Sequence, residues 1–327
     1  MKSSEKPSGP GSHDQASVGF IGVGSIGLPM AKNIVTGGFP LCVFDVSAGP
    51  LRELEACGAR VSASPAEVGR VCGIIGICVN TDKQVTQVML GDGGLLSSAR
   101  PDTIIAIHST VRPRTVLELA SVASEHGVHV LDVGITGGPH GAAAKALCYM
   151  AGGEVTLIER CRPVFETSAK TIVLTGPLGS GMAAKLCNNL ITYLEFLAGS
   201  EAFRLVEKAS VSREAFTAVT QANGVMTPFM QMFLAGMGGP ASEVNRAGRE
   251  AFVQLAEKDL SITLELARDL GVSLPATALA SQLMADMVGL KDRYPAGYGD
   301  FAQREPHPRR AQGKPTFLLN LITRPLC

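Results

Sequence analysis

Three glycines near the start of the chain have the spacing of a phosphate-binding turn. Gly22, Gly24 and Gly27 follow a short apolar run and precede a helical pattern, so the turn joins a strand to a helix. Such glycines allow the tight bend, the approach of a pyrophosphate and close packing of helix on strand, and the helix N-terminus supplies amide donors. The motif predicts a dinucleotide-binding site formed by Gly22, Gly24, Ser25, Ile26 and Gly27.

A second predicted strand ends in Asp45, within range of the acidic residue that binds ribose hydroxyls in such sites. A carboxylate accepts hydrogen bonds from both hydroxyls and repels a 2′-phosphate. Val46 and Ser47 follow, where a site for the phosphorylated cofactor normally has a basic residue. We therefore expect NAD as the cofactor, with NADP less favoured. The alternative is that Asp45 only caps the loop after the strand.

The elements that must position these residues alternate between strand and helix as far as about residue 175. Predicted strands are 18–23, 41–46, 71–79, 104–107, 128–133 and 171–174, and the helical stretches between them include 29–36, 51–57 and 114–126. This alternation predicts a parallel sheet with helices on both faces. From about residue 178 only helices are predicted, at 180–208, 212–222, 225–236, 249–270 and 275–290.

The predicted fold class is therefore α/β, a doubly wound Rossmann sheet followed by an all-α domain. We expect a disordered tail at 1–16, the NAD-binding domain at 17–177, the helical domain at 178–302 and a C-terminal extension at 303–327. Apolar residues spread around most of the helix at 182–206, which predicts burial between domains or between subunits. Together with the apolar end of the chain, this helix predicts a homodimer or homotetramer.

Composition narrows the classes of partner and compartment. Hydrophobic residues make up 46% of the 327 residues, which is a globular composition, and Lys+Arg and Asp+Glu are both 29, without the basic excess of a nucleic-acid binder. No apolar run is long enough to span a membrane, and residues 1–16 lack the core of a signal peptide. The eight cysteines form no C-x-x-C pair, so we expect reduced core thiols in a cytoplasmic protein, and no metal site.

Four separated motifs resemble those of the β-hydroxyacid dehydrogenases, and the resemblance covers about residues 17–300. The motif DVGITGGPHGA at 132–142 is similar to the family's substrate loop, and GSGMAAKLCNN at 179–189 is similar to its catalytic helix. The motifs STVRP at 109–113 and CVNT at 78–81 are similar to the turns near the nicotinamide. The fourth motif is KDL at 258–260. The Tyr-x-x-x-Lys pair of short-chain dehydrogenases and the zinc ligands of the medium-chain kind are absent. Two departures from the substrate loop, Gly134 for proline and Thr136 for serine, leave the substrate open.

The resemblance implies roles for individual residues. Lys185 exchanges the proton of the reacting hydroxyl and Asn189, four residues on and so on the same helical face, orients it. An ordinary lysine, with a pKa of about 10.4, is a poor base at neutral pH, but burial and a positive nicotinamide ring would lower that pKa. Further implied contacts are to cofactor from Val79, Asn80, Gln84, Thr110 and Lys258, and to substrate from Ser109, Thr136, Gly137, Gly138, Asn188 and Asn189.

The implied activity is hydride transfer between a nicotinamide cofactor and a small β-hydroxy acid, or reduction of the corresponding semialdehyde. An imine reductase on the same scaffold is one alternative, although those enzymes usually lack the lysine. A non-catalytic dinucleotide-binding module is the other. His108 could be a second titrating group, but a structural histidine with satisfied hydrogen bonds is the preferred interpretation.

Overall fold

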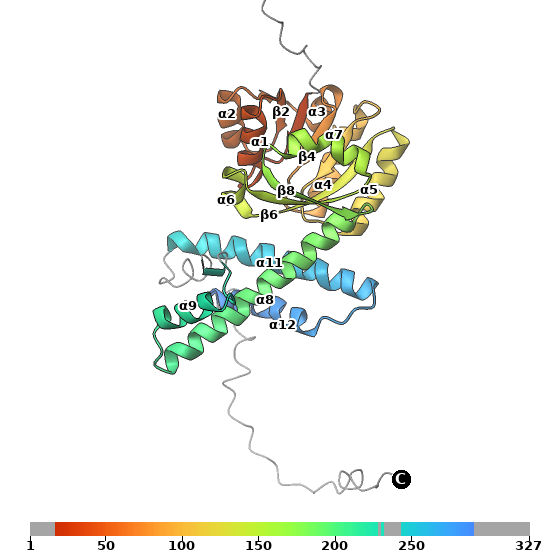
Figure 1. Ribbon diagram of the computed structural model, residues 1–327. Helices are drawn as coiled ribbons and strands as arrows, with labels where there is room; N and C mark the ends of the chain where they lie inside the picture. The colour runs from red at the N-terminus through yellow and green to blue at the C-terminus, as the bar shows by residue number, and fades with distance from the viewer. Residues whose placement is uncertain (1–16, 228–229, 232–242, 291–327) are drawn as a thin grey trace, which may run out of the picture.

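The computed structural model describes residues 17–227, 230–231 and 243–290. The predicted tail at 1–16, the extension at 303–327 with its apolar end, and most of the predicted helix at 225–236 lie outside the described residues. The rest of the chain forms two units, a sheet flanked by helices and a helical bundle, which the long helix α8 (Ser180–Lys208) joins (Figure 1).

The first unit is an eight-stranded sheet with the strand order β3-β2-β1-β4-β5-β6-β7-β8. Its strands are β1 (Val18–Ile21), β2 (Leu41–Phe44), β3 (Arg60–Val61), β4 (Ile74–Ile77), β5 (Ile104–Ile107), β6 (His129–Thr136), β7 (Leu147–Gly152) and β8 (Ala169–Gly176). The order changes direction between β1 and β4, and the crevice beyond the carboxyl ends of strands at such a point is where open α/β sheets bind ligands. The Rossmann prediction is therefore confirmed.

One pair of strands departs from the predicted parallel arrangement. All neighbours are parallel except β6 and β7, which are antiparallel. Residues 137–146 connect them and include only the short helix α6 (Gly138–Ala143), whereas a parallel crossover needs about a dozen residues or more. The chain must therefore turn back. The sequence prediction did not include β7 or the short helix before it.

Helices cover both faces of the sheet, as a doubly wound fold requires. The helices α1 (Gly27–Thr36), α2 (Ala48–Ala56), α6 and α7 (Val155–Phe165) share one hydrophobic cluster with the sheet. The helices α3 (Pro65–Val71), α4 (Asp82–Leu90) and α5 (Pro113–Glu125) share the cluster on the opposite face. The central strands β1, β4 and β5 lie between two apolar layers, which explains why their sequences read as unbroken apolar runs.

The second unit packs helices around α8. They are α9 (Arg213–Ala222), α11 (Glu243–Asp269) and α12 (Pro275–Met287), and α8, α11 and α12 share a buried apolar cluster. With 29 residues, α8 is about 43 Å long. Its first turns pack on β6, β7 and β8, and the rest packs on α11 and α12. The helix α11 begins at Glu243, earlier than the predicted start at 249. The prediction missed these first residues because the polar stretch before 249 has no apolar period that would mark it as helix.

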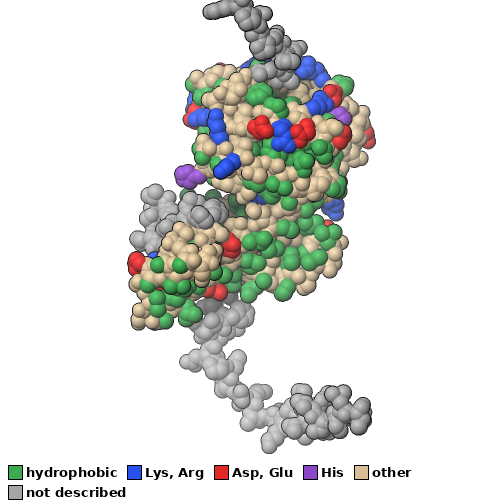
Figure 2. Space-filling model, viewed as in Figure 1, with side chains coloured by type: hydrophobic (Ala, Val, Ile, Leu, Met, Phe, Trp, Pro, Cys, Tyr) green, Lys and Arg blue, Asp and Glu red, His purple; other side chains and the backbone are tan. Residues whose placement is uncertain are grey.

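The helical unit carries much exposed apolar surface. Figure 2 shows hydrophobic side chains across much of its visible face, while charged side chains gather on the sheet unit. Two residues of α8, Ile191 and Leu205, are 58% and 71% exposed. Contacts of α8 with both units agree with the prediction of burial between domains, and the exposed positions leave burial between subunits as a prediction.

The cysteines are only partly the core thiols that the sequence predicts. Those in the described part of the chain are free; Cys42, Cys72 and Cys161 are buried, whereas Cys57, directly after α2, and Cys187, in α8, are exposed. The prediction is therefore wrong for these last two. Among the described residues, no helix is both long enough and apolar enough to cross a membrane.

Candidate active site

The glycine-rich turn has the shape of a phosphate cradle. A Cβ at Gly27 would lie 2.0 Å from the carbonyl oxygen of Gly22, so only glycine allows α1 to start this close to β1. A Cβ at Gly24 would meet no atom within 4 Å, and Gly24 and Ser25 are exposed. The N-cap residue Ile26 provides no side-chain hydrogen bond to the first turn of α1. Open space beside an uncapped helix N-terminus fits the pyrophosphate of the predicted cofactor.

Asp45 connects the end of β2 to this turn. Its Oδ2 accepts a hydrogen bond from the Val23 amide at 2.7 Å, and its Oδ1 accepts one from the Ser47 amide at 2.8 Å. The capping role that the sequence left as an alternative is thus observed. Each carboxylate oxygen can accept a second hydrogen bond, so the ribose-binding role stays a prediction that these contacts do not oppose.

The loops after β4 and β5 are tied to each other. The Ser109 hydroxyl accepts from the Val79 amide at 2.8 Å, and Ser109 is 3% exposed. The Gln84 side chain accepts from the Asn80 amide at 2.9 Å and belongs to the capping box of α4. Of the predicted cofactor and substrate contacts, therefore, the Ser109 and Gln84 side chains hold the backbone of these loops, and Asn80 is exposed.

The lysine and asparagines meet the substrate loop at the start of α8. Lys185 Nζ donates to Asn189 Oδ1 at 2.9 Å, and Asn189 Nδ2 donates to Asp259 Oδ2 of α11 at 2.6 Å. Asn188 Nδ2 donates to the hydroxyl of Thr136, at the end of β6, at 3.4 Å. The structure therefore brings the predicted catalytic pair and the predicted substrate loop together.

The substrate loop turns sharply after Thr136. Gly137 and Gly138 have φ values of 120° and 61°, a region that favours glycine, and they lead into α6. Thr136 itself is half-buried. The turn therefore begins at the hydroxyl that Asn188 contacts.

Lys258 joins the helical unit to the cofactor loops. Its Nζ donates to the carbonyl oxygen of Thr110, after β5, at 2.8 Å, and lies 3.0 Å from Asp259 Oδ1 in an ion pair. A continuous set of polar contacts therefore runs from Thr110 through Lys258, Asp259 and Asn189 to Lys185.

The setting of Lys185 changes its proton affinity. Burial, which disfavours the charged ammonium, lowers the pKa of Lys185 to about 8; the nearby Asp259 carboxylate opposes this, and the charge of Lys258 adds to it. An amine with this pKa is present in both its neutral and its charged form near neutral pH, as an acid–base group requires.

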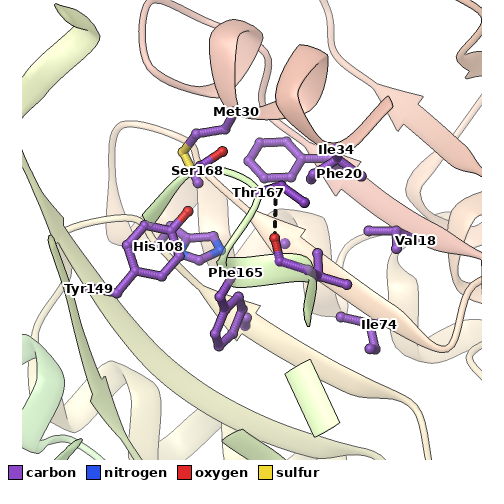
Figure 3. A pocket seen from close by; sticks show the side chains of 13 residues that line it. Val18, Phe20, Met30, Ile34, Ile74, His108, Tyr149, Phe165, Thr167 and Ser168 are labelled. Carbon is purple, nitrogen blue, oxygen red and sulfur yellow. Dashed lines mark hydrogen bonds between the residues drawn. The ribbon is translucent and has the colours of Figure 1, made fainter. Parts of the chain in front are cut away.

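His108 lies away from this cluster, inside the sheet unit. Figure 3 shows its ring in a small cavity beside Tyr149 and Phe165, and its Nδ1 lies 3.0 Å from the carbonyl oxygen of Val133. The cavity has about 10 Å³ of free space, roughly enough for one water molecule. Burial lowers the pKa of His108 to about 4, so it stays neutral. His108 is a packing residue in this structure.

Two residues of the cluster have no role in the sequence-based prediction. Asp259 is 1% exposed, and Tyr193 donates to its Oδ2 at 3.2 Å. The prediction used the KDL motif only for its lysine. One signal was present: Asp259 shares the buried face of α11 with Ala256, Leu260 and Thr263, and a carboxylate on an apolar helix face needs a partner.

Comparison with known protein families divides the chain into two matches. Residues 17–176 match the NAD-binding domain of 6-phosphogluconate dehydrogenase, and residues 179–293 match the family described as NAD-binding of NADP-dependent 3-hydroxyisobutyrate dehydrogenase. Together these two regions span most of the chain.

Individual relatives cover a similar length. The chain is 30% identical to the NAD-dependent L-serine dehydrogenase of Pseudomonas aeruginosa over 81% of this chain and 90% of that protein. It is 32% identical to the 2-(hydroxymethyl)glutarate dehydrogenase of Eubacterium barkeri over 81% and 87%. A structure of the Mycobacterium tuberculosis 3-hydroxyisobutyrate dehydrogenase with L-serine is 28% identical, has a TM-score of 0.72, and is matched over 83% of this chain and 93% of that one.

Imine reductases are more distant. The enzyme from a Pseudomonas species is 18% identical, with a TM-score of 0.58 over 85% of this chain and 96% of that chain. At this identity the likeness concerns the fold alone.

Proposed function

Because the chain belongs to the β-hydroxyacid dehydrogenase family, we propose that it oxidises a small β-hydroxy acid with NAD, or reduces the corresponding semialdehyde, with Lys185 as general acid/base. The observation that carries the proposal is the partly buried Lys185 amine, held by Asn189 beside the loop that begins at Thr136. The chain shares membership of this oxidoreductase family with its relatives. We propose in addition the class of substrate, the preference for NAD and the acid/base role of Lys185.

In the proposed reaction, Lys185 transfers the proton and the cofactor transfers the hydride. A bound nicotinamide supplies the hydride acceptor or donor. In oxidation, the neutral Lys185 amine takes the proton of the substrate hydroxyl at Nζ, while Asn189 Oδ1 holds one of its N–H groups. In reduction the ammonium returns that proton. The lowered pKa of Lys185 supports both directions near neutral pH.

The substrate carboxylate is assigned to the loop after β6. The Thr136 hydroxyl and the amides of Gly137 and Gly138 can bind a carboxylate without a fixed cation. Asn188, which contacts Thr136, orients the hydroxyl of that side chain and completes the donor set. A loop that binds only the acid end leaves the opposite end of the substrate unspecified, so small hydroxy acids and hydroxy amino acids are both candidates.

NAD is the proposed cofactor because of Asp45. A carboxylate at the end of β2 repels a 2′-phosphate, and the following residues, Val46 and Ser47, provide no positive charge. The name of one family match mentions NADP and the name of one relative mentions NAD. The choice therefore rests on the chemistry of this chain's own residue.

The experiment is a panel of hydroxy acids, including L-serine, 3-hydroxyisobutyrate and 2-(hydroxymethyl)glutarate, assayed by the absorbance of the reduced nicotinamide with NAD⁺ and with NADP⁺. We expect turnover with at least one of them, and a loss of ~10²–10⁴-fold in kcat in Lys185→Ala. Lys185→Arg is not expected to restore activity, because a guanidinium does not release its proton in this pH range.

The matched control is Lys208→Ala, which removes an exposed lysine at the far end of the same helix and leaves kcat unchanged. Binding of NADH, followed by fluorescence, stays near wild type in Lys185→Ala, since the dinucleotide is assigned to Gly22–Gly27 and Asp45. Reduction of cyclic imines without any hydroxy-acid turnover supports the imine reductase alternative. Cofactor binding with no turnover of any compound supports the binding-module alternative.

A further inference from the structure

Asp259 is a buried carboxylate near the middle of α11 to which the proposed reaction gives no part. It is 1% exposed, and a carboxylate removed from water is costly unless its oxygens find donors or a positive charge. A buried charge of this kind needs an explanation in terms of what it holds in place.

Its partners lie on two helices. Oδ2 accepts from Asn189 Nδ2 at 2.6 Å and from the Tyr193 hydroxyl at 3.2 Å, both on α8 and one helical turn apart. Oδ1 has the Lys258 ammonium 3.0 Å away as its ionic partner. The carboxylate therefore lies between α8, which carries the proposed acid/base, and the lysine that reaches the cofactor loop.

These contacts determine which way the Asn189 amide points. A carboxylate only accepts hydrogen bonds, so it selects the NH₂ end of the amide. The carbonyl end must then face the opposite way, where it accepts from Lys185 Nζ at 2.9 Å and from Asn188 Nδ2 at 3.3 Å. When the amine is neutral and donates one N–H to this fixed acceptor, its lone pair points away from Asn189, and in the proposed reaction that lone pair takes the proton of the substrate hydroxyl.

We propose that Asp259 is a positioning residue: by fixing the Asn189 amide it orients the Lys185 amine, and through Lys258 it couples that amine to the loop at Thr110. This inference rests on the proposed function of Lys185. Asp259 itself touches neither substrate nor cofactor in the proposal and acts only through the residues it binds.

The charge of Asp259 also acts on Lys185 directly. Burial lowers the pKa of Lys185, the Asp259 carboxylate raises it, and the Lys258 ammonium lowers it. From the sheet, Asp132 of β6 lies at the start of α8, where its carboxylate accepts from the amides of Gly179 and Met182. Removal of the negative charge at 259 therefore leaves the ammonium less stabilised and moves the pKa of Lys185 down.

The test is Asp259→Asn, which keeps the shape and removes the charge. In the oxidation direction with saturating NAD⁺, the acid limb of kcat/KM against pH moves to lower pH, because neutral lysine forms earlier. At the same time kcat falls by at least about tenfold, because an amide at 259 can turn either end toward Asn189. This loss is smaller than the ~10²–10⁴-fold loss in kcat expected for Lys185→Ala.

A second readout does not depend on turnover. Acetylation of Lys185 by acetic anhydride, followed by peptide mass spectrometry across pH, reports the titration of its amine in any folded variant. We expect the labelling midpoint to move down in Asp259→Asn and to stay in place in Asp269→Asn, a matched change at the exposed end of the same helix. An unmoved labelling midpoint in folded Asp259→Asn overturns the proposal.

The two readouts separate the inference from the function on which it rests. If the labelling midpoint moves but the kinetic limb does not, Asp259 acts on Lys185 but Lys185 is not the base. If Asp259→Asn does not fold, Asp259→Glu replaces it: the charge remains, so the labelling midpoint stays near wild type, while the longer side chain displaces the Asn189 amide and lowers kcat. Wild-type kcat in Asp259→Glu contradicts the positioning role.

Discussion

The proton chemistry of this site depends on one amine. Lys185 accepts a hydroxyl proton only when it is neutral, and burial lowers its pKa to about 8. In oxidation, kcat/KM therefore rises with pH through a midpoint near 8 and levels off above it. In reduction the ammonium is needed, so the rate falls as pH rises through the same region.

This pH dependence is measured in both directions with saturating cofactor. A flat oxidation profile across neutral to alkaline pH, with hydride transfer shown to be rate-limiting by a deuterated substrate, contradicts the assignment of Lys185. The same measurement tests His108 as an alternative, because its buried ring, with a pKa of about 4, would place the limb at much lower pH.

Asp45 belongs to the same scale, because one carboxylate both caps a loop and is proposed to select the cofactor. We expect a higher kcat/KM with NAD than with NADP. In Asp45→Ala the gap narrows, since the repulsion of the 2′-phosphate and the acceptors for the ribose hydroxyls are both lost. Because Oδ1 and Oδ2 also bind the amides of Ser47 and Val23, Asp45→Ala lowers Tm as well.

The control for Asp45 is Asp92→Ala, which removes an acidic side chain from the loop after α4, at the far end of that helix from the cofactor loops. It leaves the ratio of the two kcat/KM values unchanged. A wild-type preference for NADP is the result that would refute the argument from Asp45.

At the scale of elements, the position of Lys185 depends on how closely α8 approaches β6. Gly134 of β6 faces the lysine: a Cβ there would lie 2.7 Å from Lys185 Cβ and 3.1 Å from the carbonyl oxygen of Gly181. Neither of these atoms is the free end of a flexible side chain, so the helix itself must shift. This residue, which departs from the proline of the family motif, therefore sets the depth of α8 on the sheet.

Gly134→Ala is expected to destabilise the protein by about 1–3 kcal/mol, the usual cost of overpacking, and to lower kcat because Lys185 is displaced. Thermal unfolding and steady-state kinetics check both effects. Gly49→Ala is the matched control: its Cβ would meet nothing within 4 Å, it lies in α2, and alanine favours helix, so Tm stays or rises. Equal Tm values for Gly134→Ala and wild type would contradict the close packing of α8 on β6 at this position.

At the scale of the whole molecule, the two units are joined by more than α8. Arg112, before α5, forms a two-point ion pair with Glu265 of α11, with Nε and Nη2 at 2.6 and 3.0 Å from its carboxylate oxygens, and a second ion pair with Asp82 of α4 at 3.1 Å. Lys258 crosses the same junction to Thr110. The loops assigned to the cofactor are thus attached to the helix that carries Asp259.

The exposed apolar residues of the helical unit lead to the prediction of a homo-oligomer. We expect light scattering at micromolar concentration to give a dimer or tetramer, and Ile191→Glu together with Leu205→Glu to shift the mass toward the monomer, because a charge cannot be buried unpaired in an apolar contact. Val155→Glu, at an exposed apolar position on the sheet unit, leaves the mass unchanged. A monomeric wild-type protein would rule out the oligomer.

The sequence by itself determined what depends on neighbours along the chain. The glycine turn, the helix at 180–208 and all of the strands except β3 and β7 were predictable because φ/ψ preferences and apolar period are local properties. Lys185 and Asn189 share a face for the same reason: helical geometry alone brings residues four apart together.

Only the tertiary structure decided which distant groups meet. Asp259 lies 70 residues from Asn189 in the chain, and nothing in the local pattern near either residue encodes that α11 packs on α8 at this register. The contact of Lys258 with Thr110 and the burial of His108 have the same origin. Each follows from how apolar faces pack in three dimensions, and a buried polar group then takes whichever partner that packing brings to it.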